Sequence, residues 1–146
     1  MNVPNIPNNS LTKELKELVE LCQKLEDYGE GPFKFAPPAT EQEIAAWEQK
    51  NGINIPETYK EWLRFSNGSQ MQPIGFADFY ELERLVIGIN INGIVNKDMV
   101  IVGNVIGDGT FILFSRTTGK FYWESHGELG EYESFNQILN FIMDIT

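Results

Sequence analysis

His126 and Cys22 limit the chemistry that this sequence can support, because the chain has one histidine and one cysteine. A cysteine nucleophile needs a neighbouring base and a third group that orients the base. Cys22 falls on the apolar stripe of a predicted helix, where a cysteine packs as a core residue. A structural zinc site needs four nitrogen or sulfur ligands. The sequence therefore predicts no Cys–His nucleophile, no structural metal and no cofactor.

A second group with catalytic potential consists of Glu124, His126 and Glu128. Alternate residues of a strand share one face, and two carboxylates with an imidazole can bind a divalent metal. A metal-dependent hydrolase is therefore an open alternative. The other face of the same predicted strand carries Phe121 and Trp123, which are typical of a buried side. The simpler interpretation is a solvated outer face, so we assign no catalytic residue and expect a protein that is not an enzyme.

Two glycine-rich segments, 88–94 (GININGI) and 103–109 (GNVIGDG), could in principle cradle a phosphate. A P-loop requires Gly-Lys followed by Ser or Thr, and a dinucleotide fingerprint must open a helix after a strand. Neither segment meets these conditions. Their glycines are better explained as turn residues.

The overall charge restricts the class of partner. Twenty-one acidic residues against eleven basic ones give a formal net charge of −10. This charge repels nucleic-acid phosphates and anionic lipid headgroups, and it attracts basic surfaces. We therefore expect no nucleic-acid or membrane partner and favour a basic protein, although acidity can also serve solubility alone.

We expect a cytoplasmic protein. Residues 1–10 lack the basic and apolar regions of a signal peptide. No stretch approaches the roughly 18 apolar residues of a membrane span. A lone cysteine can form no internal disulfide, which suits a reducing compartment.

The acidic residues are unevenly placed along the chain. Five of them follow Lys120, and no basic residue does. Such a rim would raise the rate of association with a basic partner, whereas the plain alternative is a solvated surface. Tyrosines are frequent anchors at protein interfaces. The residues predicted to meet a partner are Asp78, Tyr80, Glu81, Glu83, Tyr122, Glu124, His126, Glu128, Glu131 and Tyr132.

Helical patterns dominate the first half of the chain. After a flexible arm, residues 1–10, apolar residues recur at spacings of three and four over residues 11–28 and predict a helix with Ser10 as its N-cap. Thr40 and Glu43 have the capping-box pattern that opens a second helix. That helix ends at the Asn51-Gly52 pair, and a third begins at Pro56 and ends by Gly68. Three aromatic residues are expected to pack where the second and third helices meet: Trp47, Tyr59 and Trp62.

Strand patterns dominate the second half. Strands are predicted at residues 76–80, 99–102, 110–115 and 120–125, with a short helical turn at 81–85 and a closing helix after Ser134. Helices followed by an antiparallel meander and a last helix are typical of an α+β fold. We predict a single domain, residues 11–146, in which N-terminal helices and a C-terminal helix pack on a mostly antiparallel sheet.

The order and spacing of these motifs resemble those of the SUKH superfamily (the Smi/Knr type), which includes a yeast regulator of cell-wall glucan synthesis. The resemblance covers about residues 11–145. It is carried by the order and spacing of Pro38-Ala39-Thr40-Glu41, Ile44, Trp47, Gly52, Ile55-Pro56, Tyr59, Trp62-Leu63, Asn67-Gly68, the Ile106–Gly109 turn, Trp123 and Ser134-Phe135.

The resemblance implies an α+β fold and a protein-binding function. Bacterial members of the superfamily resemble immunity proteins, which bind and neutralise a cognate toxin that is often a nuclease. Yeast and fungal members act as regulatory scaffolds in cell-wall assembly, which is the alternative function. Toxin-contact residues vary among members and none is transferred to this chain. Residues 73–94 show no pattern specific to the superfamily.

Overall fold

The computed structural model describes all residues, Met1–Thr146, and confirms an α+β fold with four α-helices and one eight-stranded sheet. Every strand pair is antiparallel, and the strands follow the order β1-β2-β3-β5-β6-β7-β8, with β4 paired only to β5. The elements are α1 (Thr12–Asp27), β1 (Lys34–Phe35), α2 (Glu41–Asn51), α3 (Glu57–Leu63), β2 (Ser69–Met71), β3 (Ala77–Phe79), the 3-10 helix η1 (Leu82–Arg84), β4 (Val86–Ile91), β5 (Ile94–Val105), β6 (Thr110–Ser115), β7 (Phe121–Ser125), β8 (Glu128–Tyr132) and α4 (Phe135–Asp144).

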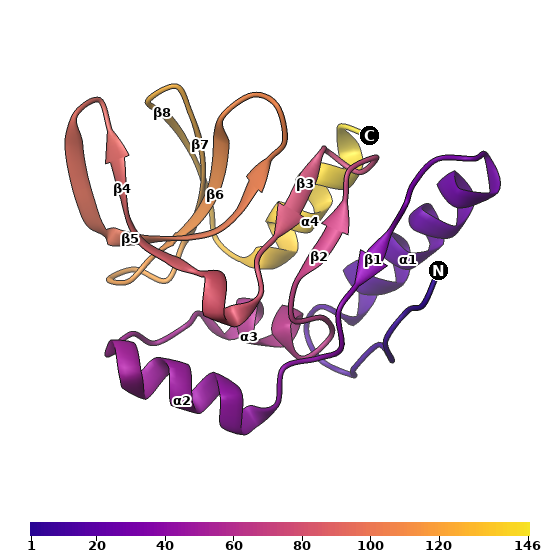
Figure 1. The fold of residues 1–146 in the computed structure, drawn as a ribbon, viewed down its shortest axis with the longest axis horizontal. Coiled ribbons are helices and arrows are strands. Elements are labelled where there is room, and N and C mark those ends of the chain that lie inside the picture. The colour runs from indigo at the N-terminus through magenta and orange to yellow at the C-terminus, as the bar shows by residue number, and fades with distance from the viewer.

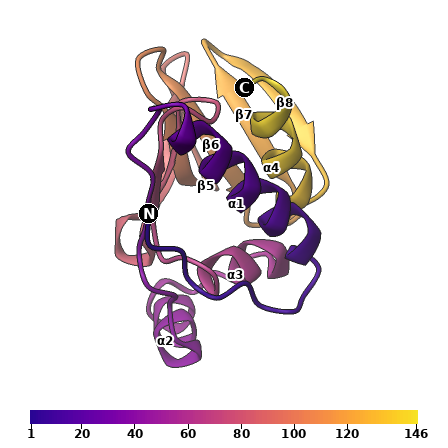
Figure 2. The same cartoon turned by 90° about the vertical axis from the view of Figure 1, so that its right-hand side faces the viewer.

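Helices α1, α3 and α4 lie on one side of a curved sheet (Figure 1). Figure 2 shows α1 and α4 side by side, with strands curving around them. Helix α2 lies apart, beyond α3, where it contacts η1. We call the side covered by α1, α3 and α4 the helical face and the opposite side the open face.

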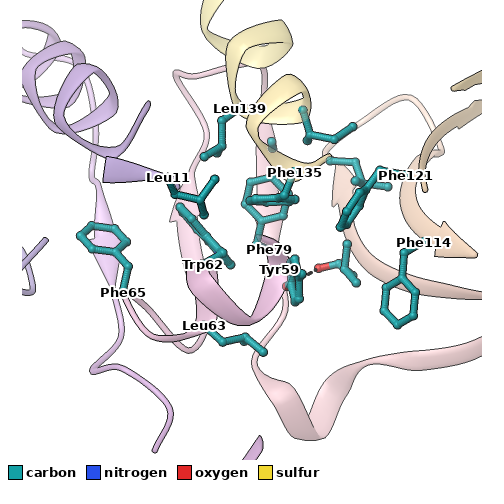
Figure 3. Packing of buried hydrophobic residues seen from close by; sticks show 14 of the residues in the cluster. Leu11, Tyr59, Trp62, Leu63, Phe65, Phe79, Phe114, Phe121, Phe135 and Leu139 are labelled. Atoms are coloured by element: carbon teal, nitrogen blue, oxygen red, sulfur yellow. Dashed lines mark hydrogen bonds between the residues drawn. The ribbon is translucent and has the colours of Figure 1, made fainter. Parts of the chain in front are cut away.

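Aromatic rings from both halves of the chain fill the core under the helical face (Figure 3). The ring centroid of Phe135, the first residue of α4, lies 5.0 Å from that of Tyr59 and 5.5 Å from that of Trp62. Trp47 belongs to the same core cluster. The predicted trio is therefore incomplete, because Phe135 and not Trp47 packs against the rings of Tyr59 and Trp62.

The local signals at helix ends are confirmed for α2 and wrong for α1. The Thr40 hydroxyl accepts a hydrogen bond from the Glu43 amide at 3.1 Å, and the Glu43 carboxylate accepts one from the Thr40 amide at 2.9 Å. Gly52 closes α2 in the left-handed conformation, with φ of 63°. The hydroxyl of Ser10, the predicted N-cap of α1, instead donates to Glu61, so it ties α1 to α3.

Residues 1–10 form no helix or strand. Val3 and Ile6 nevertheless pack against the core, and the amino group of Met1 lies 3.5 Å from the Glu26 carboxylate. The N-terminal segment thus contacts the domain, and the flexibility of the arm stays a prediction.

Strands β1, β2, β4 and β8 were not predicted from the sequence. The first two are only two and three residues long. Strand β4 turns into β5 at Asn92-Gly93, where φ values of 53° and 84° fit the primed turn that joins two antiparallel strands. No helix is long and apolar enough to cross a membrane.

Candidate protein-binding surface

One row of side chains crosses the open face of the sheet. Asp78 of β3 is paired with Asn104 of β5, Asn104 with Phe111 of β6, and Phe111 with Glu124 of β7. Because residues directly opposite in a sheet project to the same face, Asp78 and Glu124 share the open face although they are 46 positions apart in the sequence. The fold thus brings predicted partner residues from two distant segments, residues 78–83 and 122–132, onto one surface.

This face is not uniformly solvated. Ile89, Met99, Ile101 and Leu113 form a second, smaller apolar cluster there, and the half-buried rings of Tyr80 and Tyr122 pack against it. Two of the predicted partner residues, Tyr80 and Tyr122, are therefore supported by an apolar cluster.

A ridge formed by residues 78–85, from β3 through η1, separates two hollows. The first has a volume of about 530 Å³ and is lined by Lys34, Gln70, Asp78, Tyr80, Glu81 and Arg84, among others. The second has a volume of about 720 Å³ and lies between η1 and α2, with Glu43, Trp47, Lys50, Leu82, Glu83 and Leu85 among its lining residues. Asn67 fixes the ridge, because its side-chain oxygen accepts a hydrogen bond from the Leu82 amide at 2.7 Å. Four of the ten predicted residues therefore flank concave surface.

One carboxylate oxygen of Asp78 accepts no hydrogen bond. Its Oδ1 atom is buried without a hydrogen-bond partner, and Asp78 takes part in none of the ion pairs. Burial raises the pKa of its carboxyl group above the usual range, and a hydrogen bond from the Met71 backbone to the carboxylate opposes that shift in part. Burial, together with the charge of Asp78, also raises the pKa of Tyr80. A group that donates hydrogen bonds, above all a cation, would satisfy this oxygen.

The remaining ridge acids are exposed. Glu81 is 3.3 Å from Arg84 in an exposed ion pair, a contact of small energetic value. Glu83 is exposed and belongs to no ion pair. Glu83 is free to face an incoming molecule, and Glu81 can do so at a small cost once it leaves Arg84.

The β7–β8 hairpin uses Glu124 differently from the prediction. Glu124 is 7 % exposed, and its Oε1 accepts a hydrogen bond from the Gly127 amide at 2.8 Å. The expectation of a solvated outer face at this position is therefore wrong. The carboxylate turns inward because it stabilises the turn that follows it.

His126 and Glu128 do not complete a metal site with Glu124. His126 occupies the turn itself, with φ of 52°, and Glu128 pairs with Ser125, which places it on the helical side of the sheet. The expected alternation along one strand is wrong because the strand ends at Ser125. No group of three or more His, Cys, Asp or Glu side chains in the protein could hold a metal ion.

Other residues of this hairpin also have partners within the chain. The Tyr122 hydroxyl donates to Glu131 at 2.9 Å. The ammonium group of Lys120 lies 3.8 Å from Glu131 and 3.4 Å from Glu133. Tyr132 packs on Phe141 of α4, with ring centroids 5.6 Å apart. The acidic rim predicted after Lys120 is thus partly neutralised.

Cys22 is fully buried in α1, as the helical pattern predicted. Burial, reinforced by the charge of Glu26, raises the pKa of its thiol to about 12. A thiolate is therefore strongly disfavoured at this position.

Sequence reasoning missed Lys34, Gln70 and Asn67 of the first hollow. Lys34 and Gln70 belong to strands too short to leave a periodic pattern. Asn67 precedes a glycine, and in the sequence this pair predicts only a helix end. Polar residues at a chain reversal were the available signal for Asn67.

A comparison of the sequence with models of protein families identifies the family of this chain. A family model described as the SMI1 / KNR4 family (SUKH-1) matches residues 38–141, which include α2, α3 and every strand from β2 to β8. The chain belongs to the SMI1/KNR4 family (SUKH-1). The resemblance noted in the sequence is confirmed, and both the ridge and the β7–β8 hairpin lie within the matched part of this SUKH protein.

A shorter similarity links the chain to a protein of Bacillus subtilis (strain 168) named "Uncharacterized protein YnaB". The two are 49% identical over 39 residues, which make up 27% of this chain and 27% of that protein. The matched segment thus spans about a quarter of the relative.

Proposed function

We propose that this SUKH protein is a non-enzymatic immunity protein that binds a basic toxin domain and neutralises it by direct occlusion, with the ridge as the contact. The buried, unpartnered Oδ1 of Asp78 beside a hollow carries the proposal. Native proteins satisfy nearly all buried polar atoms, so such an oxygen calls for a partner. The net charge of −10 supports a partner of the opposite sign.

The chemistry of a nuclease toxin explains why carboxylates would block it. A nuclease holds its substrate through Lys and Arg contacts with phosphate. An Arg side chain entering the first hollow would donate to Asp78 and place its guanidinium near the ring of Tyr80. Glu81 and Glu83 would attract the same basic surface during approach. Occupation of these cations by the ridge would exclude the nucleic acid.

The test uses the protein encoded beside the gene for this chain, expressed as its C-terminal domain. We expect one tight complex, with a dissociation constant in the nanomolar range or below, and protection of cells that co-express both proteins. Asp78→Asn should weaken binding at least tenfold, about 1.4 kcal/mol, because a neutral amide lacks the charge that a guanidinium requires.

Asp144→Asn provides the matched control, because Asp144 is exposed and the chemical change is the same. It should leave the dissociation constant within about twofold. Several partners bound weakly would favour a regulatory scaffold. Equal effects of both substitutions, or the absence of any complex, would contradict the proposal.

A further inference from the structure

The β4–β5 hairpin has an uncharged outer part that exposes several apolar side chains. Residues 85–96 contain no Asp, Glu, Lys, Arg or His, in a chain whose net charge is −10. Four of the ten large apolar side chains exposed on the protein lie there: Val86 (47 % exposed), Ile87 (41 %), Ile94 (73 %) and Val95 (60 %). A concentration of exposed apolar side chains marks an interaction surface.

Strand β4 has a free edge. It pairs only with β5, so the backbone groups along its other side have no strand partner. Natural proteins protect such edges with charged residues or proline. Val86–Ile91 contains neither, and its irregularity at Gly88, with φ of 94°, is the one feature that interrupts the ladder.

The hairpin is held in place at its tip. A Cβ atom added to Gly127, in the β7–β8 turn, would lie 2.7 Å from the side chain of Asn92 in the β4–β5 turn. The two turns are therefore in close contact. An edge fixed in this way loses little freedom when it pairs.

The exposed apolar side chains lie on both faces of the hairpin, which decides how a partner can cover them. Val86 pairs with Ile101 of the open-face cluster, and Ile87 pairs with Val100 of the main core, so neighbouring residues point to opposite faces. A partner docked on one face would leave the other exposed. A strand added along the edge places side chains beside both faces at once.

We propose that the free edge of β4 pairs with β4 of a second copy of this chain, antiparallel across a twofold axis. Such a contact is self-complementary, since each strand offers the same edge to the other. Two molecules with a charge of −10 repel each other. Close approach is least opposed where charged side chains are absent, as they are along residues 85–96.

The test is sedimentation equilibrium of the full chain across micromolar to millimolar concentration at two salt concentrations. We expect a monomer–dimer equilibrium whose dissociation constant falls several-fold when salt rises, because salt screens the repulsion between two acidic molecules. A chain that is monomeric throughout would overturn the proposal.

Two lysine substitutions localise the contact. Val86→Lys should weaken the dimer at least tenfold, because it adds a charge beside the paired edge. Ile145→Lys is the control, since Ile145 is 54 % exposed and lies at the end of α4, outside the sheet. Equal effects of both variants would overturn the proposal.

Amide exchange of the unaltered protein provides a readout that needs no variant. The amides of Val86–Ile91 should exchange more slowly as protein concentration rises. Protection that appears elsewhere and not in β4 would contradict the pairing. No toxin takes part in these experiments, so their failure would leave the proposed immunity function untouched.

Discussion

The ridge and the β7–β8 hairpin each contain three acidic residues that were predicted to meet a partner, and the folded protein treats them differently. On the ridge, Asp78 has a buried oxygen without a hydrogen-bond partner, and Glu83 is exposed without an ion pair. On the hairpin, Glu124 caps a turn and Glu131 accepts from Tyr122 and faces Lys120. The contrast rests on Asp78 and Glu124, because each region also holds one ion-paired acid, Glu81 or Glu131, and one exposed acid without an ion pair, Glu83 or Glu128.

This difference teaches that the number of acidic residues in a segment does not measure its capacity to bind. A carboxylate already paired within the chain must break that pairing before it meets a new cation, which offsets part of the gain. A buried oxygen without a partner gains the full hydrogen bond. We therefore propose the ridge as the binding surface, although the hairpin lies in the more acidic stretch of the sequence.

The largest effect is expected from Trp62→Ala, because the Trp62 ring lies in the aromatic core on which the sheet packs. The Trp62 ring packs on Phe79 of β3 and Phe135 of α4, with centroids 5.3 and 5.5 Å away. Trp62→Ala should lower the free energy of unfolding by about 3–5 kcal/mol, since it opens a cavity at a fully buried ring. Chemical denaturation monitored by circular dichroism measures this change. An unmoved midpoint would contradict the packing of α3 beneath β3.

A smaller effect distinguishes the two regions by stability. Glu124→Gln should lower the free energy of unfolding by about 1–2 kcal/mol, because it replaces a charged acceptor of the Gly127 amide with a neutral one. Glu128→Gln provides the control on the same hairpin and should change stability by less than about 0.5 kcal/mol. Equal stabilities of the two variants would show that Glu124 does not hold the turn.

Asp78 should affect stability in the opposite direction to Glu124. Its pKa is raised in the folded protein by burial, so the folded state binds a proton more readily than the unfolded state. Its contribution to stability therefore falls as pH rises from the usual carboxyl range through the raised pKa. Asp78→Asn should be at least as stable as the unaltered protein at pH 7, and its advantage should shrink as the solution is acidified.

Thermal unfolding between pH 3.5 and 7 measures this trend. Asp98 gives a contrast, since hydrogen bonds from Ser115 and Thr117 lower its pKa. Loss of those bonds in Asp98→Asn should destabilise the protein most at neutral pH. A destabilised Asp78→Asn variant at pH 7 would mean that the hydrogen bond from the Met71 backbone outweighs the cost of burying the carboxylate.

Much of the fold followed from local signals in the sequence. The capping box at Thr40, the left-handed Gly52, strand β6 at Thr110–Ser115 and the helix after Ser134 depend on neighbouring residues alone. The prediction that Phe121 and Trp123 lie on the buried side of their strand is also confirmed by their packing against the main core.

The candidate surface depended on information that is not local. The row that joins Asp78 to Glu124 is set by the register of four strands. Each register is set by contacts between segments that are distant in the sequence. The Glu124 carboxylate is held inward by the amide of Gly127. Strand alternation alone therefore could not predict that the Glu124 side chain is buried. Composition located the acidic residues but not their partners.

The most direct test of the account compares charge reversal in the two regions during association with the toxin domain. Stopped-flow association should be measured at low and physiological salt for Glu81→Lys/Glu83→Lys and for Glu128→Lys/Glu131→Lys. The two pairs change the net charge equally, so a general effect of charge would slow both alike. We predict that the ridge pair slows association about tenfold at low salt and less at high salt, while the hairpin pair changes it by less than about twofold. Slower association for the hairpin pair, with the ridge pair unchanged, would contradict the assignment of the ridge as the binding surface.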